Sequence, residues 1–136
     1  MAELSEREQG VLRKQAFAHL STLGDDGSPH GSVVWVDVDG GDILINTAEG
    51  RAKVAHVRND PRVSVSVADP DNPYDSVSVS GTVIEDTHEG ADAHIDAMAK
   101  KYLGQDTYPF RAPDEVRVLL RIRPTGVKSM FMSDFM

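Results

Sequence analysis

Two segments in which valine and serine alternate constrain the fold of this chain more than any other feature of its sequence. Valine takes every second position in VSVSVA (63–68), and again in SVSVSGTVI (76–84) except where Gly81 replaces it. Because neighbouring side chains of a β-strand point to opposite faces, each segment is expected to form a strand with its valines toward a core. DPDNPYD (69–75) lies between them, and its two prolines and three aspartates are typical of a turn or loop.

Further strands are predicted on both sides of this pair. The segment AFAHLSTLGDDGSPHGSVVWVDVDGGDILINT (16–47) fits three strands, and its GDDG and DGGD clusters tolerate the positive φ angles of tight hairpins. EVRVLLRIRP (115–124) and GVKSMF (126–131) fit two more. Gly81 indicates a bulge or a close approach of another segment. Six or seven strands joined mostly by short turns predict a mainly β, α+β fold, in which a small antiparallel barrel removes exposed sheet edges.

Three helices are expected around this barrel. Ser5, followed three residues later by a glutamate, forms a capping-box pattern that opens a helix over 5–14. Thr47 is a candidate cap for a second short helix that ends near Asn59. A third helix is predicted over 89–103, inserted between strands. Its apolar stripe consists of Ala91, Ile95, Met98, Ala99 and Tyr102.

Length and composition narrow the class of protein. The 136 residues suit one domain, with the barrel starting near residue 17, and 22 acidic against 14 basic residues argue against a nucleic-acid partner. The absence of cysteine excludes disulfides and thiolate chemistry. His88 and His94 are out of phase on a helix, so no metal site is predicted. Neither a signal peptide nor an apolar run of about 20 residues occurs, so we expect a cytoplasmic protein without a membrane partner.

The positive charge of this acidic chain is concentrated in NTAEGRAKVAHVRNDPRV (46–63). No Lys or Arg occurs from residue 15 to residue 50, and four then follow within twelve residues, namely Arg51, Lys53, Arg58 and Arg62. One interpretation is a solvated helix whose long basic side chains flank an apolar stripe. The other is a phosphate bound where a strand ends and a helix begins, because free N–H groups and the helix dipole favour an anion there.

Only part of this cluster is expected to hold such an anion. Residues two apart do not share a helix face, so Arg51 and Lys53 converge only if Arg51 stays in the preceding loop, which Gly50 permits. Arg58 and Arg62 are explained as surface charge or subunit contacts without a ligand.

The serines of the two alternating segments form a second candidate surface. Such a face is commonly just solvated, yet small side chains also suit close contact with a flat ring or a second subunit. Trp35 fits the core and an interface equally well. The serines concerned are Ser64, Ser66, Ser76, Ser78 and Ser80.

Several segments in this order resemble one known family. VVWVDVDGGDILINTAEGRAK, NDPRVSVSVADPDNPY, HIDAMAKKYLG, YPFRAP and RVLLRIRP are similar to the pyridoxamine 5′-phosphate oxidase-like split β-barrel superfamily, and in particular to its actinobacterial branch that uses the deazaflavin coenzyme F-420. The resemblance covers residues 5–130. It implies a homodimeric oxidoreductase with coenzyme sites between the subunits, in which the reduced coenzyme passes a hydride to a conjugated small-molecule substrate.

The resemblance also implies positions for the coenzyme contacts. Arg51 and Lys53 would hold the phosphate, as the charge pattern suggests independently. The strand near Trp35 would lie along the ring system, and a second subunit would contribute from its serine face. The remaining positions implied are Val34, Val36, Asn46 and Thr47 in the same subunit, and Ser78 with Lys128, together with Ser76 and Ser80, from the partner.

Three departures from the family pattern affect the acidic polyglutamate tail of the coenzyme. Relatives often have Arg-Asn-Leu where this chain has Ala55, His56 and Val57, and arginines are frequent at the positions of Asp75 and Ser80. Each change removes a group that could meet the tail.

No residue is identified as a catalytic acid, although Tyr74 and His56 are candidates. Alternatives to the deazaflavin enzyme are an FMN-dependent oxidase or reductase on the same barrel, a non-catalytic coenzyme- or tetrapyrrole-binding protein, and a structural dimer without a ligand. True pyridoxamine phosphate oxidases are less similar, because they end in an Arg-x-His motif and this chain has no histidine after His94.

Overall fold

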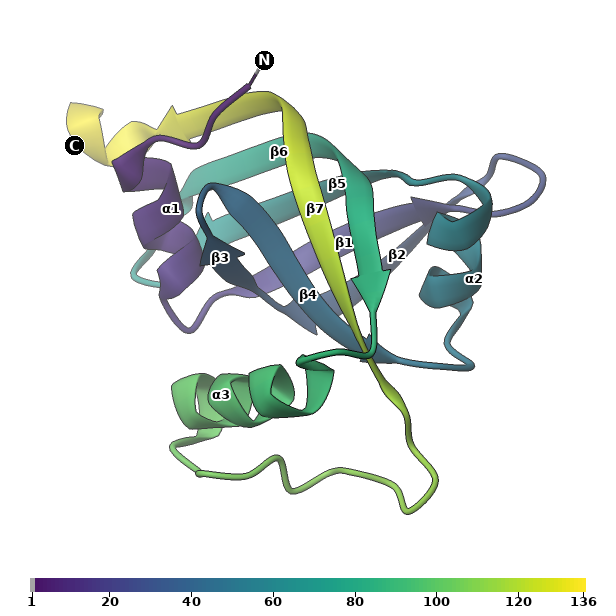
Figure 1. The fold of residues 1–136 in the computed structure, drawn as a ribbon. Coiled ribbons are helices and arrows are strands. Elements are labelled where there is room, and N and C mark those ends of the chain that lie inside the picture. Colours follow the sequence, from purple (N-terminus) through teal and green to yellow (C-terminus); the bar gives the residue numbers. More distant parts are fainter. Residues whose placement is uncertain (1) are drawn as a thin grey trace.

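The computed structural model describes residues 2–136 and contains one antiparallel sheet that curls into an open barrel (Figure 1). Seven strands are present in the described chain, in the order β2-β1-β5-β6-β7-β4-β3. The predicted mainly β split barrel with short helices is therefore confirmed. The strands are β1 (Phe17–Leu23), β2 (Pro29–Trp35), β3 (Asp37–Asp39), β4 (Asp42–Ala48), β5 (Arg62–Asp69), β6 (Asn72–Thr87) and β7 (Arg117–Phe131), and the helices are α1 (Glu6–Arg13), α2 (Ala52–Asn59), α3 (Ala91–Leu103) and the 3-10 helix η1 (Met132–Phe135).

The valine–serine segments form the central hairpin β5–β6, with their valines in the core as predicted. The turn between them is shorter than expected, because β6 already begins at Asn72 and pairs it with Asp69. The Asp69 carboxylate accepts the Asp71 N–H at 2.9 Å and lies 3.0 Å from the Lys14 ammonium, which holds the turn tight. The second half of DPDNPYD therefore belongs to a strand.

The last two predicted strands are one continuous strand, β7. Ser80 pairs with Gly126 and Gly81 with Pro124, so Thr125 is an extra residue that bulges out of the ladder. A bulge tolerates proline, which has no N–H to donate. The Thr125 hydroxyl donates instead to the Ser80 carbonyl at 3.1 Å. The strand thus continues through Pro124, the last residue of the first predicted segment.

Gly81 shows both features expected of it, a register shift and a close approach. A Cβ at this position would lie 2.7 Å from Ile122 Cγ2 and 2.9 Å from the Arg123 carbonyl oxygen. Since the carbonyl belongs to the backbone of β7, it cannot move aside without disturbing the sheet.

We therefore expect Gly81→Ala to lower the free energy of unfolding by about 1–3 kcal/mol, the usual cost of overpacking. Urea denaturation followed by far-UV circular dichroism measures this. Gly126→Ala is the matched control, because its added Cβ would meet nothing closer than 3.9 Å and should change stability little. Equal stability of the two variants would contradict the close-approach interpretation.

The three helices begin close to the predicted positions, with one correction. The Ser5–Glu8 capping box is present, and α3 ends at Gly104 with its predicted stripe facing inward. Thr47, however, does not cap α2. It lies within β4 opposite Val118, and α2 begins four residues after β4 ends. The backbone of Thr47 pairs with β7 and does not start the helix.

Helix α3 and the segment that follows it lie across one end of the barrel (Figure 1). The Tyr102 hydroxyl donates to the Ala16 carbonyl at 2.5 Å and accepts the Val36 N–H at 3.0 Å. The Lys101 ammonium donates to the Leu12 and Val36 carbonyls, and burial lowers the pKa of Lys101 to about 8. The end of α3 is thereby fixed to the barrel wall. None of the helices formed by residues 2–136 has the length and apolar character to cross a membrane.

Candidate functional site

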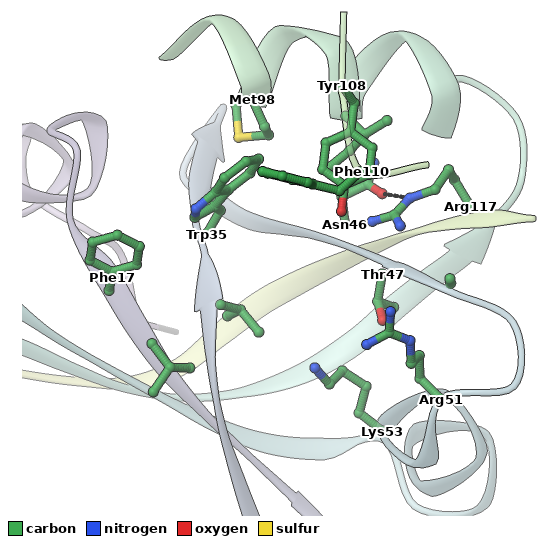
Figure 2. Close-up of a pocket in the computed structure, with 14 residues that line it drawn as sticks. Phe17, Trp35, Asn46, Thr47, Arg51, Lys53, Met98, Tyr108, Phe110 and Arg117 are labelled. Carbon is green, nitrogen blue, oxygen red and sulfur yellow. Dashed lines mark hydrogen bonds between the residues drawn. The ribbon is translucent and has the colours of Figure 1, made fainter. Parts of the chain in front are cut away.

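A cavity of about 300 Å³ lies between β4, the end of β2 and helix α3 (Figure 2). It combines a cationic end beside α2 with an aromatic end beneath α3. Its lining residues are Phe17, Val33, Val34, Trp35, Asn46, Thr47, Ala48, Arg51, Lys53, Ile95, Met98, Tyr108, Phe110 and Arg117.

Basic side chains gather in the cavity lining although the chain as a whole is acidic. It includes Arg51, Lys53 and Arg117 but no aspartate or glutamate. Within residues 2–136, neither Arg51 nor Lys53 makes a side-chain hydrogen bond or an ion pair. Burial, with the nearby charges of Arg51 and Arg117, lowers the pKa of Lys53. A bound anion would relieve this mutual repulsion, because it would favour the charged form of each group.

The turn between β4 and α2 explains how two residues in i, i+2 positions reach the same space. Gly50 adopts a φ of 88°, and Arg51 is extended with φ −77° and ψ 142°. Arg51 is thus the residue before the helix, and Lys53 lies in its first turn. No acidic residue and no side-chain cap occupies this turn, so its first N–H groups remain available. Figure 2 shows both side chains directed toward the cavity.

The other two arginines of the basic cluster are neutralised elsewhere. Arg58 forms ion pairs with Glu49 at 2.8 Å and Asp86 at 2.7 Å, and Arg62 pairs with Asp60 at 2.7 Å. Hydrogen bonds from Arg58 and His88 lower the pKa of Glu49 to about 2. Neither arginine lines the cavity, and both are paired with carboxylates of the same chain.

Aromatic rings form the opposite end of the cavity. Trp35 is stacked on Tyr102 with ring centroids 4.9 Å apart, and Tyr108 meets Trp35 edge-on at 6.0 Å. Tyr108 also contacts Phe110 at 5.7 Å, and Phe110 remains 66% exposed. Trp35 therefore forms part of a wall of the cavity and is only half-buried, so it is not a plain core residue. These rings offer flat apolar surface to a planar ligand.

Arg117 is a site residue that the sequence did not reveal. It is buried, its Nε donates to Asn46 Oδ1 at 2.9 Å, and its Nη1 lies 3.1 Å from Glu115 Oε1. The guanidinium carbon is 5.1 Å from the centroid of the Tyr108 ring. Its neighbours on the same face of β7, Arg121 and Arg123, instead contact acidic residues of the β3–β4 hairpin.

Asn46 connects Arg117 to helix α3. Its Nδ2 donates to the Ala91 carbonyl at 2.8 Å and lies 3.1 Å from His94 Nδ1, while His94 Nε2 is 3.0 Å from Asp37 Oδ2. Because Oδ1 accepts from Arg117, Nδ2 must face His94, so His94 Nδ1 accepts and Nε2 donates to Asp37. Burial alone would raise the pKa of Asp37, but hydrogen bonds from His94 and Val38 outweigh it and lower the pKa.

Comparison with known proteins assigns the family. A family model described as pyridoxamine 5′-phosphate oxidase matches residues 4–131. The chain belongs to this family. No curated protein matches it.

Three solved structures are similar to this family member. An F-420 reductase is 28% identical over 88% of this chain and 94% of its own, with a TM-score of 0.77. A conserved hypothetical protein from Mycobacterium tuberculosis is 27% identical, with coverage of 95% and 87% and a TM-score of 0.72. An FAD-binding protein from Mesorhizobium loti is 23% identical, with coverage of 94% and 95% and a TM-score of 0.67, which shows a shared fold alone.

Not all of the coenzyme-contact positions implied by the resemblance line the cavity of this family member. Val34, Trp35, Asn46, Thr47, Arg51 and Lys53 line it. Val36 is fully buried in the core. Ser78 and Lys128 are directly paired on an exposed face outside the cavity, so their role in a second subunit stays a prediction. Tyr74 and His56 are also outside the lining, and His56 bonds to Thr22 at 2.9 Å.

Proposed function

We propose that the protein is an oxidoreductase that binds the deazaflavin coenzyme F-420 and uses it to reduce a conjugated organic substrate. The observation that carries this proposal is a cavity with three cationic side chains, no carboxylate and an aromatic wall, in a chain of net charge −8. A ligand that combines an anion with a flat ring satisfies both ends. The likeness to an F-420 reductase at 28% identity supports the deazaflavin over other ring systems.

The residues present fit such a coenzyme. Arg51 supplies a planar fork and Lys53 a point charge to one phosphate, and the exposed N–H groups at the start of α2 add donors. Trp35 and Phe110 flank the space where the ring would lie. When bound in its reduced form, the coenzyme supplies the hydride, and the protein supplies position and electrostatics.

We further propose that a second copy of the chain completes the site. Phe17, Val33 and Phe110 are each more than half exposed and lie at the edge of the cavity, which suggests that a partner covers it. The serine face, with Ser78 and Lys128, would then approach the coenzyme from the partner. Sedimentation or light scattering of the purified protein, with and without coenzyme, tests this arrangement.

Parallel titrations with F-420 and FMN test the proposed function. The only tryptophan, Trp35, lines the cavity, so quenching of its fluorescence reports binding directly. We expect F-420 to bind more tightly than FMN and the reduced coenzyme to be oxidised by conjugated electrophilic substrates. Tighter binding of FMN would overturn the coenzyme assignment. Tight F-420 binding without turnover would identify a coenzyme-binding protein instead of an enzyme.

The lowered pKa of Lys53 predicts a pH dependence of coenzyme affinity. Phosphate favours the ammonium form of Lys53. Below the pKa that Lys53 has in the coenzyme-free protein, the side chain is already charged and binding does not depend on its ionisation. Above that pKa, Lys53 must take up a proton when the coenzyme binds. We expect the dissociation constant to rise as the pH increases through that pKa, below the usual lysine value of 10.5. Lys53→Arg stays charged and should lose this alkaline limb. An identical limb in both proteins would show that another group titrates.

A further inference from the structure

We propose that Arg117 holds the polar edge of the ring system, separately from the phosphate contacts of Arg51 and Lys53. This inference rests on the proposed function and deepens it. The class of ligand it selects is a planar heterocycle whose edge carries a carbonyl or enolate oxygen. Arg117 would thus be a binding residue that discriminates among rings, whereas the α2 pair recognises any suitably placed phosphate.

The first support is the way in which Arg117 is held. Its side chain is 5% exposed, with Nε bonded to Asn46 and Nη1 paired with Glu115. Nη2 has no hydrogen-bond acceptor within residues 2–136, although the guanidinium lines the cavity. A planar fork with a fixed orientation and spare donors is suited to a planar, bidentate acceptor.

The second support is an unpaired buried atom. Glu115 Oε2 is the one buried side-chain polar atom in the described chain that lacks a partner. Leaving a carboxylate oxygen in this state is unfavourable, and such exceptions to hydrogen-bond pairing in native proteins concentrate at functional sites. Glu115 makes its ion pair with Arg117, so the buried carboxylate serves to place that guanidinium at the cavity.

The third support is the position of Arg117 relative to the other two cations. Arg117 lies beside the Tyr108 ring and comes from β7, whereas Arg51 and Lys53 come from the start of α2 (Figure 2). The α2 pair has no partner in residues 2–136, but Arg117 is oriented by Asn46, which is itself fixed by α3. The cavity therefore contains one adaptable cationic pair and one rigid cation at its aromatic end.

Binding of two matched ligands separates these roles. The ligands are F-420 and its phosphate-free form, which keeps the deazaflavin ring and the ribityl chain, and the readout is Trp35 fluorescence. We expect Arg117→Met to weaken both ligands by the same factor, about 10- to 100-fold, the loss of a charge-assisted contact. The matched variant Arg51→Met should weaken F-420 by a similar factor and leave the phosphate-free ligand within twofold of wild type.

A second readout separates contact from structural support. A cation at the ring edge lowers the pKa of an acidic ring. The ring pKa of the bound phosphate-free ligand, measured by its absorbance, should therefore rise in Arg117→Met and return toward the wild-type value in Arg117→Lys. Arg117→Lys also keeps a charge opposite Glu115, so the ring pKa can still be compared with wild type in this variant if Arg117→Met does not fold. An unchanged ring pKa, or a loss confined to F-420, overturns the inference. If the wild-type protein binds neither ligand, the proposed function itself is overturned, and the inference with it.

Discussion

Replacing both Arg51 and Lys53 with alanine is expected to weaken F-420 binding by about 100-fold or more while leaving the protein folded. Each residue would contribute a charge-assisted contact of about 1.5–3 kcal/mol, and a factor of ten in affinity corresponds to about 1.4 kcal/mol. Because both side chains contact one anion, the double substitution should weaken binding by less than the sum of the two single effects. Stability should not fall, since neither side chain has a partner in residues 2–136 and Lys53 is repelled by Arg51 and Arg117.

Two controls make this result specific. Arg62→Ala removes an equally long cation that pairs only with Asp60 and lies outside the cavity, so it should not change coenzyme affinity. The phosphate-free ligand should bind the double variant as it binds wild type. Titration curves for F-420 that coincide with those of wild type would rule out the phosphate assignment.

The second large effect is expected from Ile122→Ala, which should lower the free energy of unfolding by about 2–5 kcal/mol. Ile122 is fully buried where β7 pairs with both β4 and β6, opposite Ile43 and Val83. Its Cγ2 methyl also fills the space beside Gly81. Truncation would leave a cavity at the centre of the barrel, because two strands of the sheet prevent its collapse.

Urea denaturation measures this loss, and the chain provides a matched control. Ile84→Ala removes the same atoms from a side chain that is 44% exposed, so it should cost far less. Because Ile122 is the nearest obstacle to a Cβ at Gly81, the cost of Gly81→Ala should be smaller in the Ile122→Ala background. Strict additivity of the two substitutions would show that the Arg123 carbonyl alone sets the cost at Gly81.

Local patterns were sufficient to predict most of the elements. The alternation of valine and serine determines the faces of β5 and β6, and the Ser5–Glu8 pair determines the start of α1, because both depend on near neighbours in the chain. The continuity of β7 through Pro124 depends on its partner strand, which supplies the Ser80 carbonyl to Thr125. Whether Thr47 is a cap or a strand residue is likewise decided by a distant residue that no local pattern identifies.

The charge pattern identified two residues of the candidate site, and the family resemblance named four more that line the cavity, Val34, Trp35, Asn46 and Thr47. Arg51 and Lys53 follow a long stretch without cations and a glycine, so the sequence identifies them. Arg117, Arg121 and Arg123 share one face of β7 and look equivalent in the sequence. Only the cover provided by Tyr108 and the contact with Asn46 make the first of them a cavity residue.

The segment from α3 to residue 116 leaves the barrel after β6 and returns at β7. Its two ends lie on adjacent strands, because Thr87 of β6 pairs with Leu119 of β7. This excursion supplies Met98, Tyr108 and Phe110 to the aromatic end of the cavity, to which the barrel adds Trp35, while the start of α2 supplies the cations that would bind phosphate. We therefore expect the excursion to be exchangeable as a unit. Grafting its counterpart from a relative should alter the aromatic wall, and with Glu115 the support of Arg117, without rebuilding the anion site at the start of α2. Part of ring recognition can therefore diverge, or be engineered, while phosphate binding is kept.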